Sequence, residues 1–381
     1  NGNNLHRVVV LRDDATRANQ VTPFSAFDSE DPEALWRYLA DYEKNTGGQA
    51  LAIPHNGNLS GGLMFADTRA NGEAISVAYA RERLRWEPLV EVTQMKGDGE
   101  AHPLLSPDDE FADYGTWDQY NIDMSTAQED GMQRFQYVRP ALQTGLRIEQ
   151  RTGVNPFQFG MIGSTDSHTA LAAVEEDNFW GKMSSHEPSA ERASRLWGIP
   201  EAEMSSAGLL AAGYAAVWAT ENTREALFDA MRRREVYATT GPRMRVRFFG
   251  GWNFTPEDLQ SPDSALRGYT KGVPMGGILP PPGSDPRAPV FMALALKEPE
   301  GAHLDRLQIV KGWVDSWGES REKVYDVAWS DDRKPGADGK LPPVGDTVDT
   351  ESGHYANSIG SAELSAVWTD PDFDPGLAAV Y

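Results

Sequence analysis

Short apolar runs that end directly in polar loops restrict the fold of this chain more than any other feature. Ala50–Ile53 leads into a loop that holds His55, and Phe157–Ile162 leads into a loop that holds Asp166. An uninterrupted apolar run bounded by turn residues is typical of a parallel strand buried on both faces. The pattern therefore predicts an α/β fold with polar side chains at the carboxyl ends of its strands.

Helix signals alternate with these runs between residue 1 and about residue 242. Asp31 is a predicted N-cap, Pro32 a first helical residue, and Gly47 an end signal. Asn222 and Glu225 have the spacing of a capping box. Further elements are expected as a helix over Ala141–Arg151 and strands over Leu89–Thr93 and Val236–Thr239.

After about Gly241 the helical periodicity disappears. Strand-like runs such as Phe291–Leu296, Leu307–Val314 and Val324–Trp329 alternate with turn-rich segments. A length of 381 residues makes two domains the natural expectation. We therefore predict an α/β domain over residues 1–242 and a β-sandwich-like domain over residues 243–381.

The composition excludes several classes of function. The chain has no cysteine, so thiolate catalysis and disulfides are excluded and any metal ligand must be His, Asp or Glu. A net charge of −22 argues against nucleic acid as a partner. No run of about 18 apolar residues predicts a membrane span, and the lack of cysteine suits a periplasmic or secreted protein. Nucleotide-binding loops, H-E-x-x-H helices and G-x-S-x-G elbows are absent from the sequence.

Asp166 and His168 form a D-x-H pair directly after a predicted strand. In extended backbone, residues two apart project to the same side, so both side chains could reach one ion. Imidazole with carboxylate suits Zn²⁺, Mn²⁺ or iron. The alternative is an Asx-turn beside a surface histidine. His55 follows another strand and is a third candidate ligand, or else a histidine that orients its own loop.

Two cationic residues, Lys96 and Arg243, also follow predicted strands. Either could neutralise charge on the oxygens of an anionic substrate, and the alternative for each is a salt bridge at the rim. The remaining histidines in polar loops are interpreted as structural or surface residues: His102, His186, His303 and His354.

Four segments, taken together and in order, resemble a family of unknown function labelled DUF3604: Gly2–Arg7, Ile53–Asn58, Gly163–His168 and Tyr237–Arg243. That family looks related to the polymerase-and-histidinol-phosphatase (PHP) metallohydrolases. The resemblance implies a distorted seven-stranded barrel of the (β/α)7 type, of which residues 1–242 would be part. It also implies that His6 and His55 match two isolated metal histidines of the PHP pattern, and that Asp166 and His168 match its closing D-x-H.

The PHP pattern begins with an H-x-H, further histidines and a bridging Glu, which would lie before Asn1. The resemblance therefore implies that the chain lacks the N-terminal part of the site, and that two or three divalent ions (Zn, Mn or Fe) bind the complete protein.

The expected function is metal-dependent hydrolysis of a phosphate ester or related oxyanion ester through a metal-bound hydroxide. His6 and His55 would bind one ion and His168 another, with Asp166 bridging, while Lys96 and Arg243 hold a small anionic substrate. The alternatives are hydrolysis of an amide or sulfate ester, or a non-catalytic binding or scaffold protein. Whether the chain forms a homo-oligomer stays open.

Overall fold

The computed structural model describes residues 5–117, 119–171, 180–184, 189–191, 194–199, 202–205, 208–209, 213–283 and 287–381. The chain divides into two compact units. Unit 1 comprises Asn1–Gly241 with Gly312–Arg321 and Val380. Unit 2 comprises Pro242–Lys311, Glu322–Ala379 and Tyr381.

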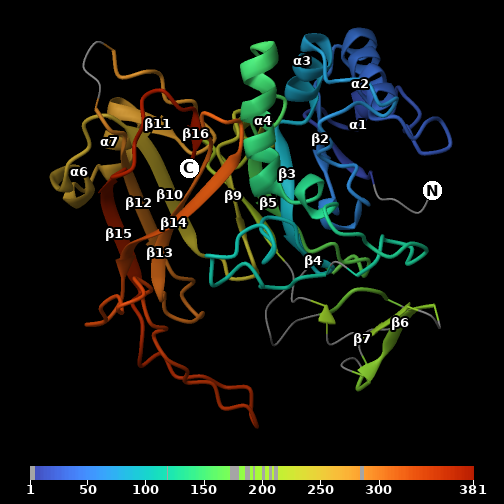
Figure 1. Cartoon of the computed structure of the whole chain (residues 1–381). Coiled ribbons are helices and arrows are strands. Elements are labelled where there is room, and N and C mark those ends of the chain that lie inside the picture. The colour runs from blue at the N-terminus through green and yellow to red at the C-terminus, as the bar shows by residue number, and fades with distance from the viewer. Residues whose placement is uncertain are drawn as a thin grey trace. The chain divides into compact units, whose positions relative to one another are not determined.

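Unit 1 mixes helices and strands (Figure 1). Its strands are β1 (Arg7–Leu11), β2 (Ala50–Pro54), β3 (Leu89–Gln94), β4 (Gly97–Asp98), β5 (Gly160–Gly163), β6 (Leu196–Ile199), β7 (Ala202–Ser205), β8 (Tyr214–Val217) and β9 (Val236–Thr239). Its helices are α1 (Ala15–Ala18), α2 (Pro32–Thr46), α3 (Val77–Trp86), α4 (Val138–Thr152) and α5 (Arg224–Arg232), with 3₁₀ turns η1 (Gly57–Leu59) and η2 (Gln133–Phe135).

The central strands of unit 1 lie side by side. β3 pairs with β5 in parallel, and β4 pairs antiparallel with β3. β1 pairs antiparallel with β2, which lies beside β3, while the antiparallel pair β8–β9 lies beside β5. The α/β character is therefore observed. Within the described residues the strands form several small sheets and close no barrel.

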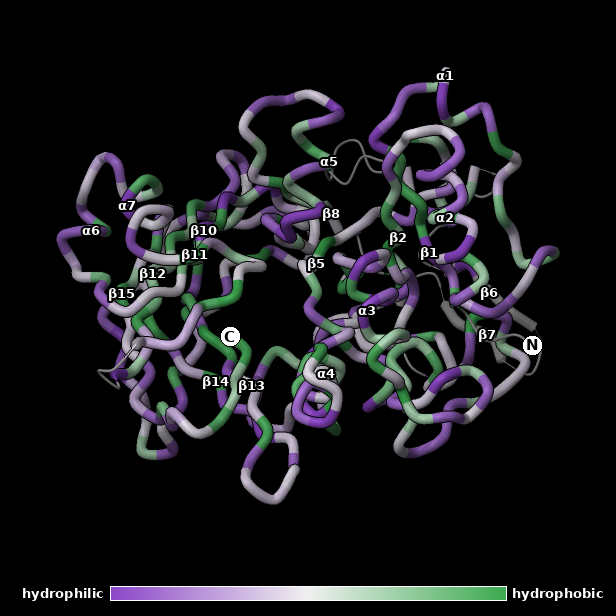
Figure 2. Tube along the Cα trace, turned by 90° about the horizontal axis from the view of Figure 1, so that it is seen from above, coloured by the Kyte–Doolittle hydropathy of each residue, from purple (hydrophilic) through white to green (hydrophobic). Residues whose placement is uncertain are grey.

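Successive side chains of a strand point to opposite faces of the sheet. Helices cover both faces of these strands. Ala50 and Ala52 of β2 share a core with residues of α2, α3 and α4. Leu51 and Ile53, the alternate residues, pack instead in a second core with Phe228 of α5. All of β2 is buried, and the strand is coloured as hydrophobic in Figure 2. A strand covered on both faces needs the uninterrupted apolar run seen in the sequence.

The helix boundaries follow their local signals closely. α2 is confirmed with Asp31 as N-cap and Gly47 in the left-handed conformation at its C-cap. The predicted start of α5 is wrong by one residue, because Thr223 and not Asn222 is the N-cap. The Thr223 hydroxyl accepts a hydrogen bond from the Ala226 amide at 3.3 Å. In α4 the helix begins three residues earlier than expected, at Val138.

Unit 2 is rich in strands. The strands after Gly241 are β10 (Arg245–Gly251), β11 (Gly272–Pro274), β12 (Val290–Leu296), β13 (Arg306–Val314), β14 (Ser320–Trp329), β15 (Glu363–Thr369) and β16 (Ala379–Val380). They belong to unit 2 except for the end of β13, the first residues of β14 and Val380, which are counted with unit 1. One sheet has the order β11-β10-β12-β15 with antiparallel pairing throughout, and a second has the order β14-β13-β16. That these sheets form a sandwich stays a prediction.

Two short helices follow Gly241, in the region where the sequence shows no helical periodicity. Unit 2 contains α6 (Pro256–Gln260) and α7 (Ser264–Lys271). Thr255 and Asp258 form a capping box at the start of α6, and Lys271 at the end of α7 pairs with Asp258 at 2.6 Å. Helices of five and eight residues are too short to produce a clear helical period, so local capping and tertiary packing stabilise them. Among the described residues, no helix is long and apolar enough to cross a membrane.

Candidate functional site

Three strands of unit 1 place polar side chains on the same side of the sheet. Each polar residue follows, two positions later, an apolar residue of the core that contains Phe228: His55 follows Ile53, Glu91 follows Leu89, and Ser164 follows Ile162. Because strand side chains alternate, the polar residue points to the same face as its apolar predecessor. The sheet therefore changes from an apolar core to a polar cluster towards the carboxyl ends of β2, β3 and β5.

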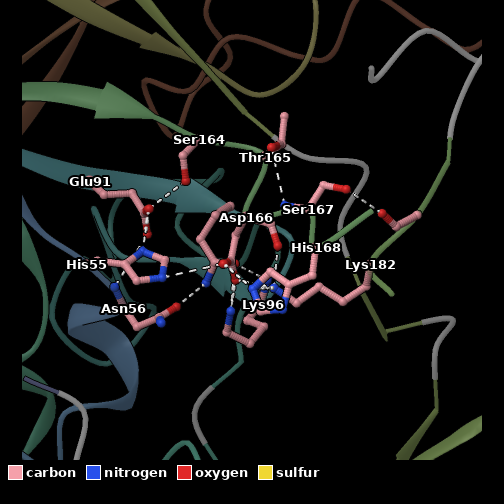
Figure 3. Close-up of polar contacts among 12 residues, drawn as sticks. His55, Asn56, Glu91, Lys96, Ser164, Thr165, Asp166, Ser167, His168 and Lys182 are labelled. Carbon is pink, nitrogen blue, oxygen red and sulfur yellow. Dashed lines mark hydrogen bonds and ion pairs between the residues drawn. The ribbon is translucent and has the colours of Figure 1, made fainter. Parts of the chain in front are cut away.

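Glu91 organises the first part of this cluster (Figure 3). Its carboxylate oxygen Oε2 lies 2.6 Å from His55 Nδ1 and accepts a hydrogen bond from the Ser164 hydroxyl at 2.5 Å. A carboxylate can only accept, so the Nδ1 of His55 donates and a neutral ring carries its lone pair on Nε2. Glu91 is only 6% exposed, which makes this orientation of the imidazole well defined.

Asp166 lies opposite the Nε2 atoms of two histidines. Its Oδ1 is 3.5 Å from His55 Nε2 and 3.3 Å from His168 Nε2. Asp166 has a φ of 49°, a left-handed conformation that Asp tolerates better than most residues. The turn thereby brings three of the four predicted metal ligands together from two separate loops.

His6, the fourth predicted ligand, lies next to His55. The two rings stack with their centroids 6.3 Å apart, and the His6 carbonyl accepts a hydrogen bond from the His55 amide at 3.0 Å. Desolvation lowers the pKa of His6, with smaller contributions from His55 and Lys96. The pKa of His168 is lowered in the same way, by desolvation first and then by nearby lysines. Both shifts favour the neutral imidazole that a metal requires.

Two ammonium groups contact the other oxygen of Asp166. Lys182 Nζ lies 2.5 Å from Asp166 Oδ2, Lys96 Nζ pairs with the same oxygen, and Lys182 Nζ is also 3.2 Å from His168 Nε2. Desolvation and the neighbouring Lys182 lower the pKa of Lys96 to about 6. Desolvation also lowers the pKa of Lys182, to about 8. Two lysine amines therefore share one carboxylate at this point, and Lys182 is the more readily protonated of the two.

Amide side chains fix the loop that carries Lys96. Gln94 Oε1 accepts a hydrogen bond from the Lys96 amide at 2.7 Å, and Gln94 Nε2 donates to Asn56 Oδ1 at 2.7 Å. Asn58 Nδ2 donates to the Lys96 carbonyl at 3.0 Å. The loop after β3 is thus tied to the loop that holds His55, so the two cannot move independently.

The other residues singled out in the sequence have different positions. Arg243 is exposed and belongs to unit 2, so its role in holding an anion stays a prediction. His102 is buried and its Nδ1 accepts a hydrogen bond from the Leu104 amide, which supports a structural role. The Nδ1 atom of His303 lies 3.0 Å from the Ile359 carbonyl oxygen. His354 is exposed. His186 lies outside the described residues.

Two members of the cluster were not predicted. Glu91 had a usable signal, because a carboxylate in the middle of the apolar strand Leu89–Gln94 is costly unless it has partners. Lys182 had none. It joins the site because its carbonyl accepts a hydrogen bond from the His168 amide at 2.7 Å, a contact between residues 14 apart that no local pattern reveals.

The donor atoms are of the kinds that bind a divalent metal. Two imidazole Nε2 atoms face one carboxylate oxygen, and the carboxylate behind His55 is the partner that metal-binding histidines commonly have. Even so, within the described ranges no three His, Asp or Glu side chains converge as a finished metal site.

The fold and the cluster define an α/β protein with a polar site at the carboxyl ends of its strands, in which imidazoles, carboxylates and lysine amines meet and His6 and His168 are exposed. The chain belongs to the DUF3604 family, because the family model described as "Protein of unknown function (DUF3604)" matches residues 1–381. No curated protein and no solved structure matches the chain.

Proposed function

We propose that this protein is a metal-dependent hydrolase that acts on a phosphate ester or a related oxyanion ester. The observation that carries the proposal is the convergence of His55 Nε2 and His168 Nε2 on Asp166 Oδ1, with Glu91 behind His55. His6, His55, Asp166 and His168 would hold the metal, which when bound supplies Lewis acidity and an activated water. A PHP-like barrel that binds two or three ions of Zn, Mn or Fe is part of this proposal.

The chain's own residues would position the substrate. Lys96 and Lys182 place two cationic groups beside the predicted metal ligands. Ammonium groups aimed at an oxyanion stabilise charge that builds up in the transition state, and each such donor is worth roughly 2.7–4 kcal/mol in comparable sites. Glu91 would hold His55 in the tautomer that binds metal.

Loss of ligands tests the proposal. Asp166→Asn and His55→Gln should lower both the bound zinc or manganese and the metal-dependent hydrolysis of an aryl phosphate to background. His303→Gln is the matched control, because His303 is a partly buried histidine of unit 2. Metal content by mass spectrometry and turnover are measured on the same samples. Unchanged metal and full turnover in both ligand variants would contradict the proposal.

A second candidate is a non-catalytic protein that binds anions. The observation in its favour is that Lys96 and Lys182 both contact Asp166 Oδ2 and line the adjoining space with basic side chains. Such a protein would bind inorganic phosphate or sulfate equally well before and after treatment with a chelator. The hydrolase should lose turnover on chelation and regain it when zinc or manganese is returned.

A further inference from the structure

A cavity of ≈ 250 Å³ opens beside the polar cluster, inside unit 1. Lys96, Lys182 and His168 form its polar end. Six of its other lining side chains are apolar: Leu59, Trp117, Ile122, Met124, Met183 and Leu209. The cavity therefore has one end with basic side chains and largely apolar walls.

The basic groups at the polar end favour an anion. Among the described residues that line the cavity the basic side chains are Lys96, Lys182 and His168, no carboxylate is among them, and both lysines contact Asp166 Oδ2. Asn121, the amide in the wall, uses its side chain within its own loop: Oδ1 accepts from the Thr126 amide at 3.1 Å and Nδ2 donates to Ser125 Oγ at 3.1 Å. The walls thus offer little hydrogen bonding to a polar ligand.

The size of the cavity limits the ligand. An apolar cavity of about 150 Å³ holds one benzene molecule, so ≈ 250 Å³ accommodates about one ring with a tetrahedral oxyanion attached. Trp117, only 7% exposed, offers an aromatic surface in the wall. A sugar or a glycerol body would leave its hydroxyl groups unpaired against such walls.

We propose that this cavity is the substrate pocket and selects an oxyanion monoester whose body is compact and apolar, of about one aromatic ring. The oxyanion lies toward Lys96 and Lys182, and the ring lies between Trp117 and Met124. This inference rests on the proposed function for its reaction, but the binding preference is a separate property. Phosphate and sulfate esters share the required chemistry.

Isothermal titration of the full chain with phenyl phosphate, phenyl sulfate, glycerol 1-phosphate and inorganic phosphate tests the pocket. At least one phenyl ester should bind roughly tenfold or more tightly than glycerol 1-phosphate, because burying the ring removes apolar surface from water. The two phenyl esters distinguish a phosphate from a sulfate head. Equal affinity for the phenyl and glycerol esters would overturn the proposal.

A wall variant gives a second test. Met124→Gln keeps the length of the side chain but adds a polar amide, so it should weaken phenyl ester binding several-fold and leave inorganic phosphate unchanged. Met132→Gln, outside the cavity lining, is the matched control and should change neither. An unchanged phenyl ester affinity in Met124→Gln would overturn the pocket.

The two proposals fail separately. Selective binding of a phenyl ester without metal-dependent turnover supports the proposed substrate pocket and contradicts the proposed hydrolase activity. Turnover of phenyl and glycerol esters with equal kcat/KM supports the hydrolase and overturns the pocket.

Discussion

At the scale of single residues, Glu91 is the side chain on which the geometry of the site depends. Its carboxylate accepts hydrogen bonds from the ring of His55 and from the hydroxyl of Ser164. Its role is therefore to position His55, in the manner of the carboxylates behind metal-binding histidines.

Glu91→Gln tests this positioning role. Losing the charge should weaken metal affinity roughly 10- to 100-fold, because the His55 ring loses its fixed tautomer and part of its basicity. The measurement is zinc or manganese titration, with the melting temperature recorded to separate positioning from unfolding. Glu129→Gln, at an exposed position, is the control. Metal affinity in Glu91→Gln equal to that of the parent would contradict the role.

Lys182 separates substrate binding from metal binding. We expect Lys182→Gln to retain its metal but to lose roughly 100-fold or more in kcat/KM, because one donor to the oxyanion is removed. Lys44→Gln, an exposed change on α2, should have no effect. If Lys182→Gln lost its metal as well, Lys182 would support the metal ligands and not the substrate.

At the scale of elements, a buried ion cluster holds β1, α2 and α3 together. Glu87 Oε1 accepts hydrogen bonds from Arg7 Nε at 2.9 Å and Trp36 Nε1 at 3.0 Å, and Glu87 Oε2 pairs with Arg83 at 3.1 Å. The carboxylate is fully buried. Because Arg7 begins the strand that follows His6, this cluster also fixes the position of a predicted ligand.

Glu87→Gln should therefore destabilise the fold by about 3–5 kcal/mol, since it leaves two buried guanidinium groups without their counter-charge. Urea denaturation measures the loss, and Arg81→Gln, an exposed change on α3, should be near neutral. A loss of less than about 1 kcal/mol would show that the cluster contributes little net stability.

The same cluster predicts sensitivity to acid. Burial alone would raise the pKa of Glu87, but Arg7 and Arg83 outweigh it and hold the pKa below its ordinary value of 4.5. A group with a lowered folded pKa stabilises the protein above its unfolded pKa and loses that contribution as the pH falls through the folded pKa. Stability should thus fall below pH 4.5 in the parent, and less steeply in Glu87→Gln.

The N-cap of α5, which is Thr223 and not the predicted Asn222, can be tested directly. Thr223→Ala should cost about 1 kcal/mol, because the Ala226 amide loses its acceptor. Asn222→Ala should stay within about 0.5 kcal/mol, as for most surface changes. Equal losses in the two variants, measured by thermal unfolding, would contradict the assignment of Thr223 as the N-cap.

These elements also show how far the sequence alone leads. Local signals located α2 and β2 well, because an N-cap, a C-terminal glycine and an uninterrupted apolar run act over a few residues. They missed α6 and α7, whose short length hides any period. Lys182 was out of reach because its place depends on a contact with the His168 loop, which no pattern along the chain encodes.

At the scale of the whole molecule, the strand order of unit 1 explains the site. β3 and β5 run in parallel, so the loops that carry Lys96 and Asp166 emerge at the same edge. The loop after β2 joins them because β2 lies beside β3. The apolar runs anticipated the parallel pairing of β5 with β3, but the pairing of β2 with β1 is antiparallel, because burial on both faces does not fix strand direction. The order of the strands depends on tertiary packing that a single sequence does not specify.

The central claim is that His55, His168 and Asp166 bind a catalytic metal. The most direct measurement is anomalous diffraction from crystals of the protein grown with zinc or manganese, collected on both sides of the absorption edge of the metal. We predict a peak within bonding distance of His55 Nε2 and Asp166 Oδ1, with Glu91 still on His55 Nδ1. Crystals saturated with metal that show no peak there, and Lys96 and Lys182 still paired with Asp166, would contradict the claim.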